Sequence, residues 1–401
     1  MARRIDDIVA KLNKKYGGQD DAPVVFRASE SPILKINRLR TGVFSIDLAT
    51  GGGVPQGRVT RVFGPYSSGK TWLCLRIIRE NQHLCHNCWE TLSEKKGSKC
   101  CGSPQPFRTM WLDAEGVWDN DWAEAQGVNT ANVFVVRTES SERSMDICHA
   151  SLEELAFDLV VVDSVAALTS IKEIESSQED AKVALNARVM NEAMRKWVSC
   201  LNGVTDLRSA SRRTTIILIN QIRMTISAFG DPEVQTGGKA PEFASSLDIR
   251  PERNRTLTDT GKLVGFNVNT ENAGVPVAIL CRFRIPKNKV APPHRAGEFL
   301  FWFKDDPKSD RKVGDVDCSQ AIFDHGQRLG SIVKRGRMYV AFIAGDEVEL
   351  STRAEDAVKA ILKDSSLSRR LEDDIIERLV GGGPSPSVGG SDPSLGPNPS
   401  D

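Results

Sequence analysis

The chain has 401 residues, of which 40% are hydrophobic, and its 53 basic and 53 acidic residues give a formal net charge of zero. This length suffices for one large core and a smaller domain, and the balanced charge excludes attraction of polyanions through overall charge. No apolar run approaches the roughly 20 residues that cross a bilayer, and the N-terminus lacks the apolar segment of a secretory signal. We therefore expect a cytoplasmic protein whose nucleic-acid contacts, if any, depend on local loops.

The first predicted element is an amphipathic helix over residues 5–16. Two glycines follow and end it. A helix this short buries its apolar stripe on its own domain or on a neighbouring subunit, and spacing alone does not distinguish the two. The stripe has the i, i+3, i+4, i+7 pattern and consists of Ile5, Ile8, Val9 and Leu12.

From about residue 37 to 306, strand-like and helix-like segments alternate. Several of the strands are continuous apolar runs, which are typical of central parallel strands covered on both faces. We therefore predict an α/β fold with a mainly parallel central sheet flanked by helices, and ligands at the carboxyl ends of its strands. The predicted strands are residues 59–63, 109–112, 133–136, 159–162, 214–219, 277–283 and 298–303, and a helix is predicted over 181–201.

The sequence GPYSSGKT at residues 64–71 follows the first of these strands and opens a helical run. This strand-loop-helix context is the one that a phosphate-binding loop requires, and it argues against a chance glycine-rich turn. Backbone N–H groups of such a loop surround phosphate oxygens, while Lys70 reaches the β- and γ-phosphates and the Thr71 hydroxyl coordinates Mg²⁺. The predicted nucleotide-binding residues are Gly64, Pro65, Tyr66, Ser67, Ser68, Gly69, Lys70 and Thr71.

Acidic side chains follow the next strands. Asp113 and Glu115 come after strand 109–112; Asp113 also fits a helix N-cap, whereas Glu115 is predicted to orient the attacking water. The apolar strand 159–162 runs into Asp163, which together with the phosphate loop predicts a second nucleotide motif with this carboxylate in the Mg²⁺ shell beside Thr71.

The strand over residues 214–219 ends in Asn220 and Gln221, two amides placed where a γ-phosphate could be sensed. On the residues alone, ordinary turn chemistry is the favoured interpretation. Residues 222–243 follow with little periodic pattern, and about twenty structureless residues inside a compact domain are usually functional or disordered.

Four of the nine cysteines lie within residues 85–101. A C-x₂-C pair is followed after eleven residues by two adjacent cysteines, a pattern similar to a zinc ribbon or knuckle. Free thiols or a redox pair are the alternative, because the second pair lacks C-x₂-C spacing. The candidate zinc ligands are Cys85, Cys88, Cys100 and Cys101, with His83 or His86 as alternatives that could complete the set.

A strand over residues 338–342 and helices over 353–362 and 371–379 predict a smaller C-terminal domain. The Gly, Pro and Ser composition after residue 380 is typical of a disordered tail. We expect four parts: an N-terminal helix and linker (1–36), an ATPase core (37–306) with a cysteine-rich insertion (83–104), the C-terminal domain (307–380) and the tail (381–401).

Taken together and in order, the motifs resemble those of the bacterial RecA strand-exchange recombinases. The resemblance runs from about residue 37 to 305, more faintly to 372, and implies a RecA-type P-loop core with an N-terminal oligomerisation helix and a small α/β C-terminal domain. The motifs that carry it are GVFSIDL (42–48), GGGVPQGR (51–58), GPYSSGKT (64–71), DAEG (113–116), VVVDSVAAL (160–168), NQIRMTI (220–226), TGGKAPEFASS (236–246) and PKNKVAPP (286–293).

The resemblance implies an activity. ATP-bound subunits would assemble head-to-tail into a helical filament on single-stranded DNA, hydrolyse ATP in a DNA-dependent manner, pair the strand with homologous duplex DNA and exchange strands. Residues 173–182 and 222–243 correspond to the family's two DNA-binding loops. The implied DNA-contacting residues are Arg188, Arg195, Arg223, Met224, Gly237 and Gly238.

The resemblance also implies roles around the nucleotide. Gln221 would act in catalysis with Glu115 and Lys70, linking the γ-phosphate to the second loop. Lys287 and Lys289 would reach a neighbouring subunit's nucleotide, although alone they fit a solvated turn. The remaining implied residues are Trp122, which stacks on adenine, Asp119 and Ser164 in the nucleotide site, and Phe243 at the subunit contact.

The sequence departs from the family pattern in places. The first loop is acidic and lacks glycines, Glu242 replaces an expected basic residue, and the cysteine-rich insertion and missing acidic tail are consistent with a phage-encoded member in a host cytoplasm. Two other classes stay open: a hexameric helicase on the same core, which would form rings, and a non-catalytic ATP-gated mediator, which DNA would not stimulate.

Overall fold

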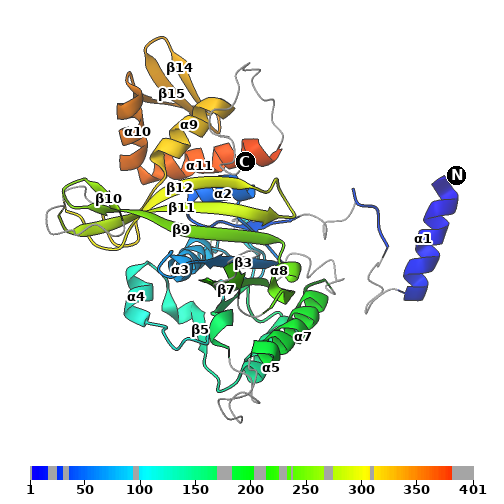
Figure 1. Ribbon diagram of the computed structural model, residues 1–401. Coiled ribbons are helices and arrows are strands. Elements are labelled where there is room, and N and C mark those ends of the chain that lie inside the picture. The colour runs from blue at the N-terminus through cyan, green and yellow to red at the C-terminus, as the bar shows by residue number, and fades with distance from the viewer. Residues whose placement is uncertain are drawn as a thin grey trace, which may run out of the picture. The chain divides into compact units, whose positions relative to one another are not determined.

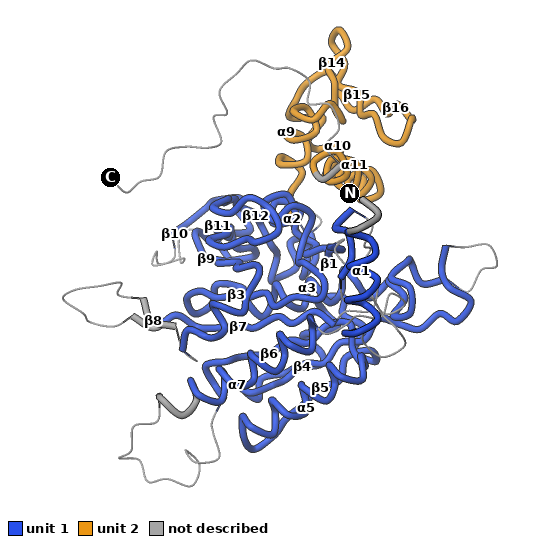
Figure 2. The backbone as a smooth tube through the Cα atoms, turned by 90° about the vertical axis from the view of Figure 1, so that its right-hand side faces the viewer, with its two compact units in different colours: residues 1–316 blue, residues 317–401 orange. Residues whose placement is uncertain are grey.

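The computed structural model describes residues 2–16, 25–29, 36–93, 99–168, 183–202, 214–224, 233–235, 238–265, 274–307 and 311–381 (Figure 1). The chain divides into two compact units, residues 1–316 and 317–401, coloured blue and orange in Figure 2. No helix in the described part of the chain has the length and apolar character needed to span a membrane.

A large sheet forms the centre of the first unit, with the strand order β13-β12-β11-β9-β3-β7-β6-β4-β5 among the described residues. β10 pairs with β9 and β8 with β7. The strands are β3 (Val59–Gly64), β4 (Thr109–Asp113), β5 (Val133–Val136), β6 (Leu159–Asp163), β7 (Thr215–Met224), β8 (Glu233–Gln235), β9 (Leu247–Thr258), β10 (Leu263–Gly265), β11 (Pro276–Asn288), β12 (Arg295–Trp302) and β13 (Val316–Asp317).

The half of the sheet from β9 to β5 is parallel, and β11 and β12 extend it with antiparallel pairs. Every residue of β6 is buried, as expected of a central strand covered on both faces. Side chains alternate along a strand, so Val160 and Val162 face one layer and Val161 the other. The prediction of a mainly parallel sheet flanked by helices is confirmed.

Helices α5 (Ser141–Glu153) and α7 (Val183–Asn202) pack on the face that Val160 and Val162 share, where Trp197 is fully buried. α3 (Lys70–Asn81) follows the phosphate loop and buries an apolar stripe that includes Leu73, Ile77 and Ile78. The smaller elements are β1 (Arg38–Leu39), α2 (Phe44–Thr50), β2 (Val54–Pro55), α4 (Asn120–Ala125), α8 (Ala240–Ala244) and 3-10 turns at Thr130–Asn132 and Val165–Ala167.

The prediction of a turn at Asn220 and Gln221 is wrong, because β7 continues through both residues to Met224. Gln221 pairs in register with Gly64 of β3, and the next residue, Ile222, pairs with Gln235 of β8. Gly64 is far from Gln221 in sequence, so local turn propensity is overridden by sheet pairing. β8 and α8 also lie within the predicted structureless loop; residues 225–232 and 236–237 of that loop are outside the described residues.

The predicted N-terminal helix is present as α1 (Ala2–Tyr16). Its apolar residues Ile5 and Ile8 are 60% and 49% exposed. Asp6 pairs with Arg27, and the side-chain amide of Asn13 exchanges hydrogen bonds with the backbone of Val25. The described polar contacts of α1 are therefore with the segment that follows it, at Val25 and Arg27.

Over its described residues, 317–381, the second unit joins a three-stranded antiparallel sheet to three helices around a small core that includes Ile322, Phe323, Ala341 and Leu371. The predicted strand and two helices are present, whereas α9, β14 and β16 were not predicted. Residues 382–401 of the predicted tail are outside the described residues. The elements are α9 (Ser319–Leu329), β14 (Ile332–Arg335), β15 (Met338–Ile343), β16 (Asp346–Ser351), α10 (Ala354–Lys363) and α11 (Ser365–Gly381).

Candidate nucleotide site and cysteine cluster

The loop of residues 64–71 joins the carboxyl end of β3 to the first turn of α3. Gly69 caps the helix with a left-handed backbone (φ 86°), which favours glycine. A Cβ atom at Gly64 would lie 2.6 Å from the carbonyl oxygen of Pro251, so a side chain there would clash with backbone. The first amides of α3 lack acceptors within the helix, and a helix N-terminus of this kind binds anions.

Lys70 is buried, with 8% of its surface exposed. Its Nζ donates to the carbonyl oxygens of Gly64, at 3.1 Å, and Pro65, at 2.6 Å. Burial lowers the pKa of this amine, and the carboxylates of Asp163 and Glu115 counteract that shift. Among the described residues, the acceptors of this ammonium are loop carbonyls, which it can exchange for the oxygens of a phosphate.

Two acidic groups converge beside this loop. Asp163 at the end of β6 accepts a hydrogen bond of 3.1 Å from the Thr71 hydroxyl. Glu115 Oε1 accepts from Gln221 Nε2 at 2.8 Å and from the hydroxyl of Ser164. Four strands, β3, β4, β6 and β7, therefore bring the predicted hydrolytic and magnesium-binding residues to one edge of the sheet.

Asp163 is 1% exposed, and burial raises its pKa to about 7, with a further contribution from the nearby carboxylate of Glu115. A carboxyl with its pKa raised in the folded state gives stability that is present below the unfolded pKa and is lost as the pH rises through the folded pKa. The ligand-free protein therefore loses stability from this group between about pH 4 and pH 7.

The variant Asp163→Asn carries no titrating group at this position. We expect its melting temperature, measured calorimetrically without nucleotide and with EDTA, to match that of the unmodified protein near pH 4 and to exceed it at pH 8. The difference should grow up to about pH 7 and then stay constant. A difference independent of pH would show that Asp163 is ionised throughout in the ligand-free fold.

Asp113 differs from Glu115 because it pairs with backbone N–H groups of its own loop and with the guanidinium of Arg137. Its carboxylate accepts from the backbone N–H groups of Val117 and Trp118 at 3.0 and 3.1 Å, and it forms an ion pair with Arg137 at 2.7 Å. The helix N-cap interpretation of Asp113 is wrong, because the residues after it form a loop and Asp119 caps the next helix, α4. Arg137 was missed, since no sequence signal joins two residues on different strands.

A pocket lies beside the phosphate loop. Asp119 caps α4 by accepting from the backbone N–H of Trp122 at 2.9 Å, and Trp122 is 40% exposed. Three tryptophans are among the lining residues, and a planar base can stack on such rings. The residues that line the pocket are Thr71, Leu75, Trp111, Val117, Trp118, Asp119, Trp122 and Asp163.

Lys287 and Lys289 on the β11 side both point at α8. Lys287 Nζ donates to the carbonyl oxygen of Glu242 and to Ser245 Oγ, and Lys289 Nζ lies 3.4 Å from the carbonyl oxygen of Phe243. Burial lowers the pKa of Lys287, and the neighbouring charge of Lys289 acts in the same direction. The Phe243 side chain is 72% exposed, which is unusual for an aromatic residue within a monomer.

The residues predicted to contact DNA are only partly described. Arg188 and Arg195 are exposed on α7, and Gly238 has a left-handed backbone (φ 73°) beside Ala187 of that helix. Arg223 and Met224 form the end of β7. Gly237 and residues 173–182 lie outside the described residues, as do the side chains of Arg223 and Met224.

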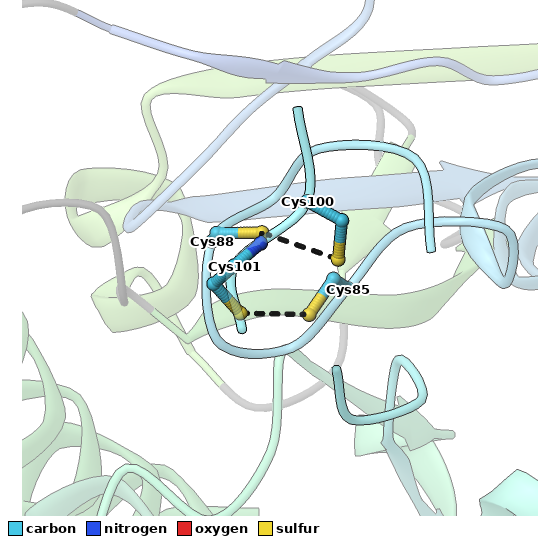
Figure 3. Close-up of side chains that lie close together, drawn as sticks. All are labelled: Cys85, Cys88, Cys100 and Cys101. Carbon is cyan, nitrogen blue, oxygen red and sulfur yellow. Dashed lines mark hydrogen bonds between the residues drawn. The ribbon is translucent and has the colours of Figure 1, made fainter. Parts of the chain in front are cut away.

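The four cysteines of the insertion converge, and Figure 3 shows their side chains pointing toward one another. All four Sγ atoms lie within 4.8 Å of one another, and two Sγ pairs, Cys85–Cys101 and Cys88–Cys100, are 3.8 Å apart. A tetrahedral ion with Zn–S bonds of about 2.3 Å separates its sulfur ligands by about 3.8 Å. The two 3.8 Å pairs therefore already have the spacing of a tetrahedral zinc site, and the four sulfurs are close enough to share one ion.

Backbone N–H groups point at the same sulfurs: that of Cys101 lies 3.4 Å from Cys88 Sγ, and that of Gln105 lies 3.4 Å from Cys85 Sγ. Such donors stabilise thiolates, which are the form that binds a metal. The two histidines considered as alternative ligands, His83 and His86, are not among the converging ligands found in the described residues.

His86 instead anchors the insertion to the sheet. Its Nδ1 lies 2.9 Å from Asp158 Oδ1, and Asp158 also accepts from the N–H of Arg108 at 2.8 Å. Asp158 and Arg108 directly precede β6 and β4, so the cluster lies at the amino ends of two strands whose carboxyl ends carry Asp163 and Asp113.

The family model and the relatives that match this chain all belong to one family. A family model described as the RecA N-terminal domain matches residues 3–94 and 104–306, and the interruption falls in the cysteine-rich insertion. "Protein RecA" of Wolinella succinogenes is 31% identical over 97% of this chain and 93% of its own length. The proteins of the same name from Campylobacter fetus (32%; 94% and 92%) and Campylobacter lari (33%; 90% and 89%) are similar over comparable lengths.

Proposed function

This chain belongs to the RecA family of recombination and repair ATPases, and from that premise we propose that it binds ATP and Mg²⁺ at residues 64–71, forms filaments on single-stranded DNA, and pairs that strand with homologous duplex DNA. The observation that carries the proposal is the position of Glu115, held by Gln221 and Ser164 beside Lys70 and Asp163.

The phosphate loop would hold the triphosphate through the backbone of residues 64–69, and Lys70 would exchange the carbonyls of Gly64 and Pro65 for phosphate oxygens. Thr71 and Asp163 would hold Mg²⁺, which neutralises charge on the phosphates. Trp122 and Asp119 would bind the base in the aromatic pocket.

Glu115 would orient the attacking water, as a carboxylate can. Its two hydrogen-bond donors, Gln221 and Ser164, are neutral groups that fix its direction. A γ-phosphate near Gln221 would compete with Glu115 for the amide. β7 runs from this amide to Arg223 and Met224, so the competition would be felt in the second DNA loop.

Sequence-independent contacts from Arg188, Arg195, Arg223, Met224, Gly237 and Gly238 would suit a protein that accepts any DNA sequence. Lys287 and Lys289 would exchange their α8 carbonyl partners for the nucleotide of the next subunit. Phe243 of α8, whose carbonyl oxygen Lys289 contacts, has an exposed side chain and would contact that subunit.

Two measurements test the proposal together: the ATPase rate with and without single-stranded DNA, and negative-stain electron microscopy with ATP and Mg²⁺. We expect DNA to stimulate hydrolysis and helical filaments to form. Closed rings would favour a hexameric motor, and hydrolysis indifferent to DNA would favour a mediator.

We also propose that the four-cysteine cluster binds one structural Zn²⁺. We expect about one zinc per chain by metal analysis after purification in metal-free buffer. Cys88→Ser removes one thiolate and should lose the metal, whereas Cys200→Ser, a cysteine of α7 outside the cluster, should keep it. Zinc-free unmodified protein, with four titratable thiols in the insertion, would contradict the proposal.

A further inference from the structure

We propose that Arg137 is a positioning residue for hydrolysis: it holds the Asp113 loop, residues 113–119, in the conformation that presents Glu115 to Gln221 and Ser164. This inference rests on the proposed function of that site. Arg137 directly follows β5, the strand at the edge of the sheet, and is not part of any motif that binds nucleotide.

The contacts join both ends of the loop to one guanidinium. Arg137 Nε and Nη2 lie 2.8 and 2.7 Å from Asp113 Oδ2, and Nη2 is 3.5 Å from the carbonyl oxygen of Trp118. The same carboxylate accepts from the N–H groups of Val117, at 3.0 Å, and Trp118, at 3.1 Å. Asp113 therefore links the start of the loop to its far end by hydrogen bonds, and Arg137 contacts both ends.

The burial of Asp113 makes its ion pair with Arg137 important for the conformation of the loop. Most surface ion pairs contribute little because both partners are solvated, and Arg137 itself is 57% exposed. The Asp113 side chain, however, is 0% exposed, and a buried carboxylate without a partner is strongly unfavourable. Asp113 also adds negative charge beside Asp163, so the site brings three carboxylates together and Arg137 neutralises one of them.

The loop carries two functions between its ends. Glu115 lies near its start, and Val117, Trp118 and Asp119 line the aromatic pocket. A shift of the loop would therefore move the carboxylate that orients water and the wall that contacts the base. Misplacement of a positioned group by about 1 Å can reduce a rate up to a hundredfold.

The test is steady-state ATPase of the full chain with single-stranded DNA. Arg137→Met should lower kcat about tenfold and raise KM for ATP less, and Arg137→Lys should recover part of kcat because an ammonium keeps the charge but not the forked contact. Arg143→Met, an exposed arginine of α5, is the matched control and should leave kcat and KM unchanged.

A double variant distinguishes a positioning role of Arg137 from a general contribution to stability. Since Arg137 acts through Asp113, Arg137→Met should slow Asp113→Asn no further, and melting curves should show all variants folded at the assay temperature. Additive losses, or an unchanged kcat in Arg137→Met, would overturn the role of Arg137 alone. No hydrolysis by the unmodified chain would instead overturn the proposed function and this inference with it.

Discussion

Lys70→Ala is expected to abolish ATP-dependent strand exchange and to lower the ATPase rate by about 10²–10³. In the structure the Lys70 ammonium is buried against two loop carbonyls and faces the site where the β- and γ-phosphates would bind. Its removal takes away the positive charge that stabilises the phosphoryl oxygens during transfer. The measurements are phosphate release and joint-molecule formation with matched DNA substrates.

The alanine variant should fold, because burial already disfavours the charged amine, as its lowered pKa shows. Lys262→Ala, an exposed lysine at the β9–β10 turn, is the control and should keep full activity. Equal loss in both variants would indicate general destabilisation, and full exchange by Lys70→Ala would remove Lys70 from the site.

Glu115→Ala is expected to bind ATP with nearly unchanged affinity and to lower turnover by about 10²–10⁴, since it removes the group that orients water but none that holds phosphate. The sharper variant is Glu115→Gln. Its amide oxygen can still accept from Gln221 and Ser164, so the local structure is kept while the carboxylate is lost. Equilibrium ATP binding checks the unchanged affinity, and single-turnover hydrolysis checks the loss of turnover.

Because bound ATP would persist in Glu115→Gln, filaments on single-stranded DNA should be longer-lived than those of the unmodified chain. Retention of the full hydrolysis rate would exclude Glu115 as the residue that orients water. Loss of ATP affinity along with turnover would instead place Glu115 in nucleotide or metal binding.

The parts of the site that follow local rules were predictable from sequence. GPYSSGKT needs only a strand before it and a helix after it, and both are present as β3 and α3. Acidic residues at strand ends meet because parallel strands present their carboxyl ends at one edge. The convergence of Thr71, Glu115 and Asp163 follows from that geometry.

Features that depend on distant pairing were not predictable. Gln221 fits a turn locally, yet pairing with Gly64 of β3 holds it in a strand. β9 carries many polar residues and alternates clearly only over its first four, but pairing with β3 and β11 fixes it. The Arg137–Asp113 pair likewise joins two strands. Whether a histidine would complete the cysteine set was open in the sequence, but the structure brings four cysteines together and pairs His86 with Asp158.

Residue roles in DNA binding and the expected four-part division of the chain stay predictions. Arg188 and Arg195 have the exposure that DNA contacts need, but exposed arginines are common. The structure divides the chain after residue 316, whereas the sequence places the start of the C-terminal domain at residue 307.

The most direct test of the central claim is joint-molecule formation by the purified chain. Labelled single-stranded DNA, supercoiled duplex of matching or unrelated sequence, and Mg²⁺ are incubated with ATP, with a slowly hydrolysed ATP analogue, or with no nucleotide. We expect joint molecules only with matching duplex and only when ATP or the analogue is present. Joint molecules without nucleotide, or none under any of these conditions, would contradict the account.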